Sequence, residues 1–233
     1  MRSHEIEVFG SGIAQKPRFR GEGPLPHPAP PVNELLRQDT RASPGMGSAS
    51  YVYLRWIGNK EPEEGMLEEV KDRTQSVFEV PARIMDTNER PAGAFDPARG
   101  QYSSTKILRW VLRDVPVDAR KVVAITDGDL FIPVLTCVFG EAQLGGQGAV
   151  VSTARLRLDL SGLPSPSPLF RARLSKECLH ELGHTFGLTH CGFSRCVMSR
   201  SNTVPDVDAK DWTLCQDCRK LLVELQKRTG DEP

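Results

Sequence analysis

HELGHTFGLTHC, residues 180–191, is the stretch on which the interpretation of this sequence depends. His180 and His184 are four residues apart, so on a helix their side chains project from the same face, one turn from each other. Two neutral imidazoles at that spacing chelate zinc. Gly187 is free to take a positive φ, so it predicts the end of the helix and a turn that returns His190 as a third ligand.

Glu181 lies beside the first histidine on the same helix face. A carboxylate in this place predicts a general base that takes a proton from a metal-bound water. Three protein ligands leave a fourth position for that water, which is typical of a catalytic zinc site, and zinc lowers the pKa of the water to about 7. The alternative is that the histidines lie on a helix surface and bind nothing. The extended pattern HExxHxxGxxH disfavours this alternative, because it falls on a segment independently predicted to be a helix that ends at glycine.

Four of the six cysteines follow this motif closely, as Cys191, Cys196, Cys215 and Cys218. Two such pairs are the ordinary arrangement of a tetrahedral all-thiolate zinc site, which has no open position and cross-links the chain. We therefore interpret the four cysteines as ligands of a second, structural zinc, with two disulfides or unrelated buried cysteines as the alternative. Because Cys191 directly follows His190, neighbouring side chains are expected to serve different metals.

Composition and charge favour a soluble protein without a polyanionic partner. The chain has 233 residues, with 30 lysines and arginines against 30 aspartates and glutamates, so its formal net charge is zero and no nucleic acid is expected to bind. Glu5 and Glu7 interrupt the N-terminal segment where a secretory signal needs an apolar core, and no segment has the length of a membrane span. We expect a cytoplasmic monomer with no membrane partner. In that reducing compartment, cysteines more often bind metals than form disulfides.

The chain divides into an extension and one domain. Residues 1–49 are rich in proline and glycine and are expected to form a flexible N-terminal extension. Residues 50–233 are expected to form a single domain, whose C-terminal part, residues 191–233, carries the four-cysteine zinc site. Whether the extension covers the catalytic zinc stays open, because His4 or His27 could reach the fourth ligand position.

Hydrophobic periodicity predicts a mixed α/β (α+β) fold. Strands are expected at residues 51–58, 80–86, 121–130, 134–140 and 148–156, and helices at residues 62–78, 103–115, 169–187 and 218–228. The first three strands alternate with helices, which predicts parallel pairing with right-handed crossovers. A glycine-rich turn between the last two strands predicts a hairpin, so one of them is antiparallel and lies at an edge. We expect a mainly parallel twisted sheet with an antiparallel edge strand, an active-site helix and a C-terminal zinc-bound subdomain.

A family resemblance supports these interpretations. HELGHTFGLTHCGFSRCVMS, followed by CQDC, resembles the signature of the archaemetzincins, a family of metzincin-type zinc metallopeptidases, and the resemblance is strong over residues 177–218. It implies a zincin-like fold, hydrolysis of peptide bonds and two zinc ions, one catalytic and one structural. It assigns the catalytic zinc to His180, His184 and His190, the general base to Glu181, the methionine turn beneath the metal to Met198, and the structural zinc to Cys191, Cys196, Cys215 and Cys218. Arg200 stands where some other metzincins have a tyrosine, so no phenol is expected at that position.

The resemblance also implies how a peptide or protein substrate binds. An antiparallel edge strand borders the cleft and pairs with the substrate backbone by strand addition. We assign this edge to residues 134–140 and expect Glu141 and Ala142 near the cleft. The zinc-bound water then attacks the substrate carbonyl with Glu181 as base, and the protonated Glu181 passes its proton to the leaving amine.

Two other classes of function stay open. In the first, the domain is a catalytically idle zinc protein that binds peptides or partner proteins, although such a site has no chemical need of Glu181. In the second, the cysteine module binds nucleic acid like a zinc ribbon, which the neutral net charge and scattered cations such as Arg200 and Lys210 disfavour.

Several acidic residues near the motifs have two interpretations. Glu177, one turn before Glu181, is either an acceptor behind the metal ligands or a solvated residue on the helix surface. Asp206, Asp208 and Asp211 are expected to be surface loop charges, unless one of them accepts a hydrogen bond from a ligand histidine.

Overall fold

The computed structural model describes residues 8–11, 50–85, 90–159 and 161–228. Within residues 1–49 it therefore describes one strand before the domain, β1 (Val8–Ser11). The expected flexibility of the rest of the extension, and the expected reach of His4 and His27, lie outside the described residues.

A six-stranded sheet forms the centre of the domain, with the strand order β1-β9-β10-β6-β2-β3. Its other strands are β2 (Tyr51–Trp56), β3 (Ala82–Met85), β6 (Ala119–Thr126), β9 (Gly140–Gln143) and β10 (Gly148–Ser152). Strands β3, β2, β6 and β10 are parallel, β9 runs antiparallel to β10, and β1 runs antiparallel to β9. The mainly parallel mixed sheet confirms the predicted fold class.

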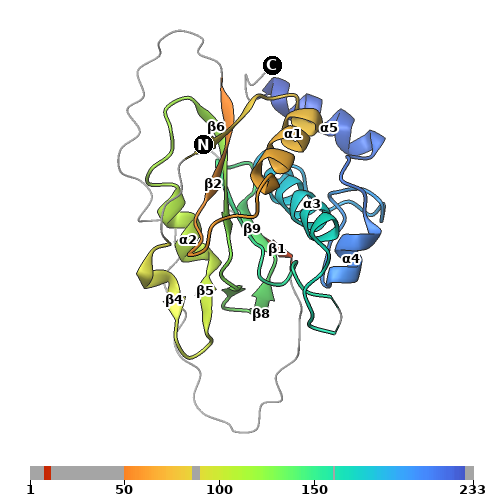
Figure 1. Ribbon diagram of the computed structural model, residues 1–233. Coiled ribbons are helices and arrows are strands. Elements are labelled where there is room, and N and C mark those ends of the chain that lie inside the picture. The colour runs from red at the N-terminus through yellow and green to blue at the C-terminus, as the bar shows by residue number, and fades with distance from the viewer. Residues whose placement is uncertain (1–7, 12–49, 86–89, 160, 229–233) are drawn as a thin grey trace, which may run out of the picture.

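Helices cover both faces of this sheet (Figure 1). Helices α1 (Met66–Phe78) and α3 (Ser167–Thr185) pack together on one face, and α2 (Ser104–Val111) lies on the other. Alternation along β6 explains the two layers, because Val123 and Ile125 belong to the apolar cluster with α1 and α3, whereas Val122 and Ala124 belong to the cluster with α2. A central parallel strand buried on both faces has such a continuous apolar run.

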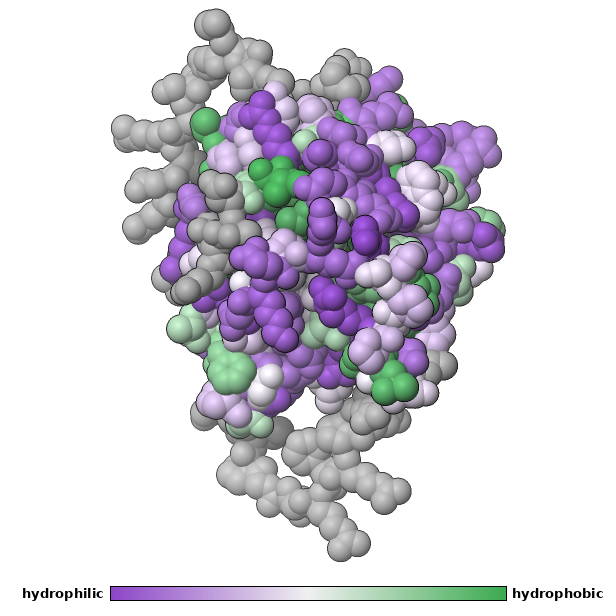
Figure 2. All heavy atoms as spheres, viewed as in Figure 1, coloured by the Kyte–Doolittle hydropathy of each residue, from purple (hydrophilic) through white to green (hydrophobic). Residues whose placement is uncertain are grey.

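Apolar side chains are gathered inside these layers. On the face shown in Figure 2, hydrophilic side chains predominate and hydrophobic ones form small, separate groups. Among the described residues, no helix combines the length and the apolarity that crossing a membrane requires.

A second, smaller sheet corrects the predicted position of the edge strand. Its order is β4-β5-β7-β8, formed by β4 (Phe95–Asp96), β5 (Gln101–Ser103), β7 (Leu130–Ile132) and β8 (Leu135–Val138). Most of residues 134–140 therefore lies in β8, and the antiparallel strand of the main sheet is β9. The prediction was wrong because the apolar run before Gly140 has high strand propensity, whereas β9, with the sequence GEAQ, contains no β-branched or aromatic residue.

The C-terminal part begins with a sharp turn after α3. Gly187 has a φ of +97°, and its N–H donates to His184 O at 2.9 Å, while Leu188 N–H donates to Gly183 O at 3.0 Å. This pair of hydrogen bonds is the Schellman arrangement, so the predicted helix end at glycine is confirmed. The other helices within the described residues are the 3-10 turn η2 (Ala92–Ala94), α4 (Val204–Ala209) and α5 (Gln216–Arg228).

Replacing this glycine gives a test of the turn. We expect Gly187→Ala to lower the free energy of unfolding by about 1–2 kcal/mol, because an L side chain at positive φ brings Cβ too close to the neighbouring carbonyl. Urea denaturation measures the change. Gly192→Ala is the control, because Gly192 has no positive φ and a Cβ there meets nothing within 4 Å. Equal stability of the two variants would contradict the prediction.

Candidate metal centre

Three histidines meet at the C-terminal end of α3. His180 and His184 lie one helical turn apart with their Nε2 atoms separated by 3.1 Å. His190 arrives after the turn at Gly187, and its ring centroid lies 5.3 Å from that of His180 and 5.0 Å from that of His184. One nitrogen from each of the three imidazoles lies within 4.8 Å of the others. The structure therefore brings together the histidines that the sequence motif selected.

Backbone carbonyls orient two of these imidazoles. His180 Nδ1 lies 2.8 Å from Val197 O, and His184 Nδ1 lies 2.8 Å from Leu188 O. A carbonyl oxygen only accepts hydrogen bonds, so each Nδ1 carries the proton and each Nε2 keeps its lone pair. This is the tautomer in which Nε2 binds a metal, and such a partner also holds the ring in place.

The environment keeps all three imidazoles neutral. Burial, with the nearby Lys210 ammonium, holds the pKa of His180 well below its ordinary value. Burial lowers the pKa of His184 to about 4, and burial together with the Arg200 guanidinium lowers the pKa of His190 to about 4. Neutral imidazole is the form that binds metal ions, so three convergent neutral nitrogens fit a zinc ion with an open position.

Glu181 is fully buried and faces the first residue of β9. A Cβ at Gly140 would lie 2.6 Å from Glu181 Cγ and 2.8 Å from Val150 O. Only glycine allows the strand and the helix side chain to approach this closely. The carboxylate is therefore held between the metal-binding helix and the antiparallel strand.

The residues that follow Gly140 correct a second expectation. Glu141 is buried, but its carboxylate accepts hydrogen bonds from the hydroxyl groups of Ser104 and Thr105 at the start of α2. It therefore points to the face of the sheet opposite Glu181 and not toward the metal centre. Strand alternation returns Ala142 to the face covered by α3.

Met198 packs against α3 at Gly183, the residue before His184. It is fully buried, and a Cβ added to Gly183 would overlap its Sδ, so the thioether contacts the backbone of α3. Met198 O also accepts a hydrogen bond from Cys191 N at 2.9 Å. The methionine turn is thus bound both to the helix and to the chain that leaves His190.

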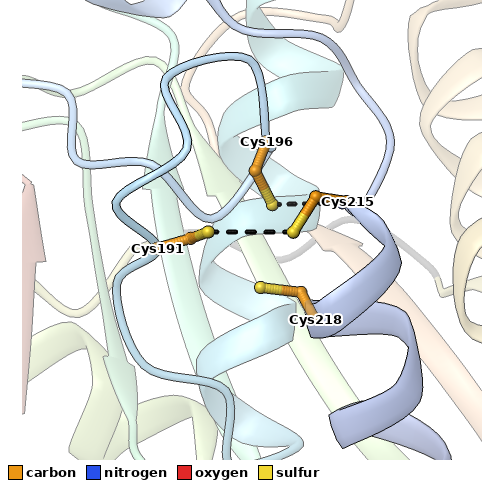
Figure 3. A group of neighbouring side chains, drawn as sticks. All are labelled: Cys191, Cys196, Cys215 and Cys218. Carbon is orange, nitrogen blue, oxygen red and sulfur yellow. Dashed lines mark hydrogen bonds between the residues drawn. The ribbon is translucent and has the colours of Figure 1, made fainter.

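The four cysteines form a second cluster (Figure 3). Their sulfur atoms point toward one another and lie within 4.8 Å of one another, with Cys191 Sγ 3.8 Å from Cys215 Sγ. Cys191 and Cys196 come from the loop after α3, whereas Cys218 lies in the first turn of α5 and Cys215 directly precedes it. Four convergent sulfurs from two segments fit a tetrahedral zinc site that cross-links them.

All six cysteines are free thiols, so the structure contradicts the disulfide alternative. Backbone amides already donate to two of the sulfurs, from Phe193 N to Cys191 Sγ at 3.4 Å and from Cys215 N to Cys196 Sγ at 3.3 Å. Burial raises the pKa of the Cys196 thiol, and the N–H of Cys215 opposes this rise because it favours the thiolate, the form that binds zinc.

A buried ion pair behind His180 was not expected from the sequence. Glu177 is fully buried and its Oε1 lies 2.8 Å from Lys210 Nζ, so it is not a solvated residue of the helix surface. Lys210, counted above among the scattered cations, is also buried. A single lysine in a polar stretch gives no sequence signal of burial, because its partner lies on a distant helix.

The three aspartates expected in a surface loop have other partners, and two of them, Asp206 and Asp208, lie in helix α4. Asp206 caps the N-terminus of α4, Asp208 forms an ion pair with Arg173, and Asp211 forms one with Arg195. Arg200, at the position of the absent tyrosine, is exposed and places Nη2 3.4 Å from His190 Nδ1. A cation therefore borders the third histidine where some other metzincins have a phenol.

A mixed sheet, a helix with two histidines and a buried glutamate, a third histidine and a methionine turn together define a metallopeptidase of the metzincin class. The sequence profile of peptidase family M54 matches residues 64–224. The chain belongs to this family and is a zinc metallopeptidase that hydrolyses peptide bonds. Family membership favours this activity over the idle zinc-binding alternative.

Individual relatives agree with this assignment. The archaemetzincin of Methanocaldococcus jannaschii is 40% identical over 171 residues, which cover 73% of this chain and 92% of the relative. The crystal structure of the Methanopyrus kandleri archaemetzincin matches with a TM-score of 0.70 and 33% identity, covering 79% of this chain and 99% of that one. The Archaeoglobus fulgidus archaemetzincin, solved with malonate, matches with a TM-score of 0.62 and 31% identity, covering 73% and 98%.

The contact between Gly140 and Glu181 generates a prediction. We expect Gly140→Ala to lower kcat for peptide cleavage by about 100-fold, because the new Cβ displaces a group that needs accurate placement. Steady-state kinetics and the zinc content of the same sample measure the effect, and the zinc content is expected not to change. Gly93→Ala is the control, since a Cβ there meets nothing within 4 Å. Unchanged kcat in Gly140→Ala would show that the contact is unimportant.

Proposed function

We propose that His180, His184 and His190 hold the catalytic zinc, and that Glu181 is the general base of peptide hydrolysis. The observation that carries this proposal is the convergence of three neutral imidazoles within 4.8 Å at the helix face that also carries the buried Glu181. A zinc ion at this site supplies Lewis acidity, which polarises a substrate carbonyl and lowers the pKa of coordinated water to about 7.

Residues of the chain orient the metal ligands, transfer the proton and support the histidines. Val197 O and Leu188 O hold the imidazoles in the tautomer that ligation needs. Glu181 takes a proton from the attacking water and then delivers it to the leaving amine nitrogen, which is the usual exchange for a carboxylate placed beside the reacting atoms. Met198 supports the histidines through its contact with α3 at Gly183.

We assign a second zinc to Cys191, Cys196, Cys215 and Cys218, which makes two zinc ions per chain. Its role is structural, because four thiolates leave no open position. The site ties the loop after His190 to the start of α5, and so limits the movement of a loop that carries a ligand of the first metal. The three-histidine site has an open position for substrate, whereas the four-cysteine site has none.

Strand β9 is the proposed binding edge for an extended peptide substrate. Its first residue, Gly140, contacts Glu181, so a peptide paired with β9 lies next to the proposed base. In the structure this edge pairs antiparallel with β1, in the register Ser11 opposite Gly140 and Phe9 opposite Ala142. Strand addition is a common mode of peptide recognition, and β1 and a substrate would compete for the same edge.

We further propose that residues 50–233 form the peptidase domain, to whose sheet the extension of residues 1–49 adds strand β1, and that the protein is a cytoplasmic monomer without a nucleic-acid partner. Six free cysteines support the cytoplasmic compartment, and a net charge of zero supports the absence of a nucleic-acid partner. Size-exclusion chromatography with light scattering tests the monomer, and cell fractionation tests the compartment.

The role of Glu181 has a direct test. We expect Glu181→Gln to retain two zinc ions per chain but to lower kcat by about 10²–10⁴-fold, the usual contribution of a general base. Elemental analysis of the purified protein measures zinc, and cleavage of a peptide library followed by mass spectrometry measures activity.

Glu69→Gln is the matched control, because Glu69 is partly exposed and pairs with Arg73 on α1, a helix that carries none of the histidines. Wild-type cleavage by Glu181→Gln would overturn the assignment of the base. Fewer than two zinc ions in the wild-type protein would overturn the assignment of the two metal sites.

Competition between β1 and substrate predicts the effect of removing the extension. We expect deletion of residues 1–49 to raise kcat/KM for peptides about tenfold, the effect of a pairing that contributes about 1.4 kcal/mol. Gly10→Pro in the full chain is expected to act in the same direction, since proline cannot donate to a strand ladder. Gly23→Pro, outside β1, is the control. Unchanged kcat/KM after the deletion would mean that β1 does not compete with substrate.

A further inference from the structure

The ion pair between Lys210 and Glu177 lies directly behind the first histidine of the catalytic set. The two side chains are fully buried, with Lys210 Nζ 2.8 Å from Glu177 Oε1 and 3.5 Å from His180 Nδ1. Burying two charges costs about as much as their attraction returns, so replacing such a pair by apolar residues is often neutral or stabilising. Stability of the fold is therefore a weak explanation for placing charges here.

The lysine contacts the methionine turn. Lys210 Nζ lies 3.4 Å from Ser199 O, and the imidazole of His180 donates to Val197 O at 2.8 Å. These two carbonyls belong to the residues immediately before and after Met198. The turn is therefore held on one side by a proposed metal ligand and on the other side by the ammonium group.

The glutamate neutralises a charge that would otherwise oppose metal binding. An unpaired ammonium group 3.5 Å from a nitrogen of His180 would repel a divalent ion bound to the other nitrogen of the same ring. Glu177 cancels this charge, and Ser201 Oγ donates to the same carboxylate oxygen at 3.4 Å. The two opposite charges of the buried pair therefore nearly cancel at the metal centre.

We propose that Lys210 and Glu177 are a positioning pair for the catalytic metal. Lys210 holds the methionine turn against His180, and Glu177 supplies the counter-charge that makes a buried cation compatible with a divalent ion across the imidazole. This inference rests on the proposed function, because it requires His180 to be a metal ligand. Neither residue touches the substrate or the reacting atoms, so both act through His180 and the turn.

The test uses the full chain and four variants: Glu177→Gln, Lys210→Met, the double variant of these two, and Lys176→Met. Lys176 is the matched control, because it is a lysine next to Glu177 on α3. Its ammonium group donates to Val207 O at 3.0 Å and to Asp208 O at 3.2 Å in α4. Chelator competition with Zn²⁺ gives the metal affinity. Absorption of the Co²⁺-loaded protein separates the histidine site from the cysteine site, since only the latter has thiolate charge-transfer bands. Peptide cleavage gives kcat and KM.

The single variants are expected to differ in kind. Glu177→Gln lowers the metal affinity of the histidine site by about 10–100-fold, the range seen for residues that support metal ligands. Lys210→Met retains the metal, but it changes the Co²⁺ spectrum of the histidine site and lowers kcat with KM unchanged. The double variant regains most of the affinity lost in Glu177→Gln, because no unpaired cation remains. Lys176→Met matches the wild type in every measurement.

Other outcomes overturn the inference. Equal loss of metal affinity in both single variants, with no recovery in the double variant, would mean that the pair only stabilises the fold. Unchanged metal affinity and Co²⁺ spectra in all variants would mean that the pair does not position the metal. If circular dichroism shows that Glu177→Gln is unfolded, the Co²⁺ spectrum of Lys210→Met decides: a match to the spectrum of Lys176→Met overturns the inference. A wild-type chain that binds no metal at the histidines overturns the proposed function as well, whereas intact wild-type binding with unaffected variants overturns this inference alone.

Discussion

The last turn of α3 supports the rest of the metal centre, because its backbone carbonyls are bonded to partners outside the helix. His184 O accepts hydrogen bonds from Gly187 N and from Gly145 N in the β9–β10 hairpin, at 2.9 Å and 2.8 Å. Thr185 O accepts from Lys121 Nζ of strand β6 at 2.8 Å. With these carbonyls satisfied, the chain reverses at Gly187, and Leu188 O returns to orient the imidazole of His184. The geometry of the histidines therefore depends on where the sheet holds the end of this helix.

The same helix buries an unusual number of polar and ionisable side chains. Glu177, His180, Glu181 and His184 are all at most 1% exposed, although an ordinary helix would turn such residues toward solvent. Each of these groups loses hydration on burial, which costs free energy unless a partner replaces the water. Backbone carbonyls accept hydrogen bonds from the two histidines, and Lys210 forms an ion pair with Glu177. A bound metal ion would satisfy the nitrogens that remain, so metal binding and folding of this region are expected to be coupled.

Local spacing made part of this architecture predictable. The separation of His180 and His184, the glycine that ends the helix and the paired cysteines each depend on a few neighbouring residues, and the structure brings together both ligand sets that they predicted. Long-range contacts account for the rest. Strand β9 has little strand propensity of its own and forms because β10 and α3 surround it. The burial of Lys210 depends on Glu177, which lies in α3, more than thirty residues earlier in the chain. Pairing of β1 with β9 joins segments more than a hundred residues apart, and no local pattern signals it.

The adjacency of His190 and Cys191 follows from how the two sites share backbone. Cys191 N donates to Met198 O, and Val197 N donates to Thr213 O, each at 2.9 Å. The turn that carries Met198 is thus bonded on one side to the chain leaving His190 and on the other to the chain approaching Cys215. The two proposed metal sites on this short stretch would stiffen each other, because neither loop can shift without breaking hydrogen bonds that hold the other. A structural metal bound directly after His190, as proposed, would therefore limit the motion of this histidine more effectively than the same site placed further along the chain.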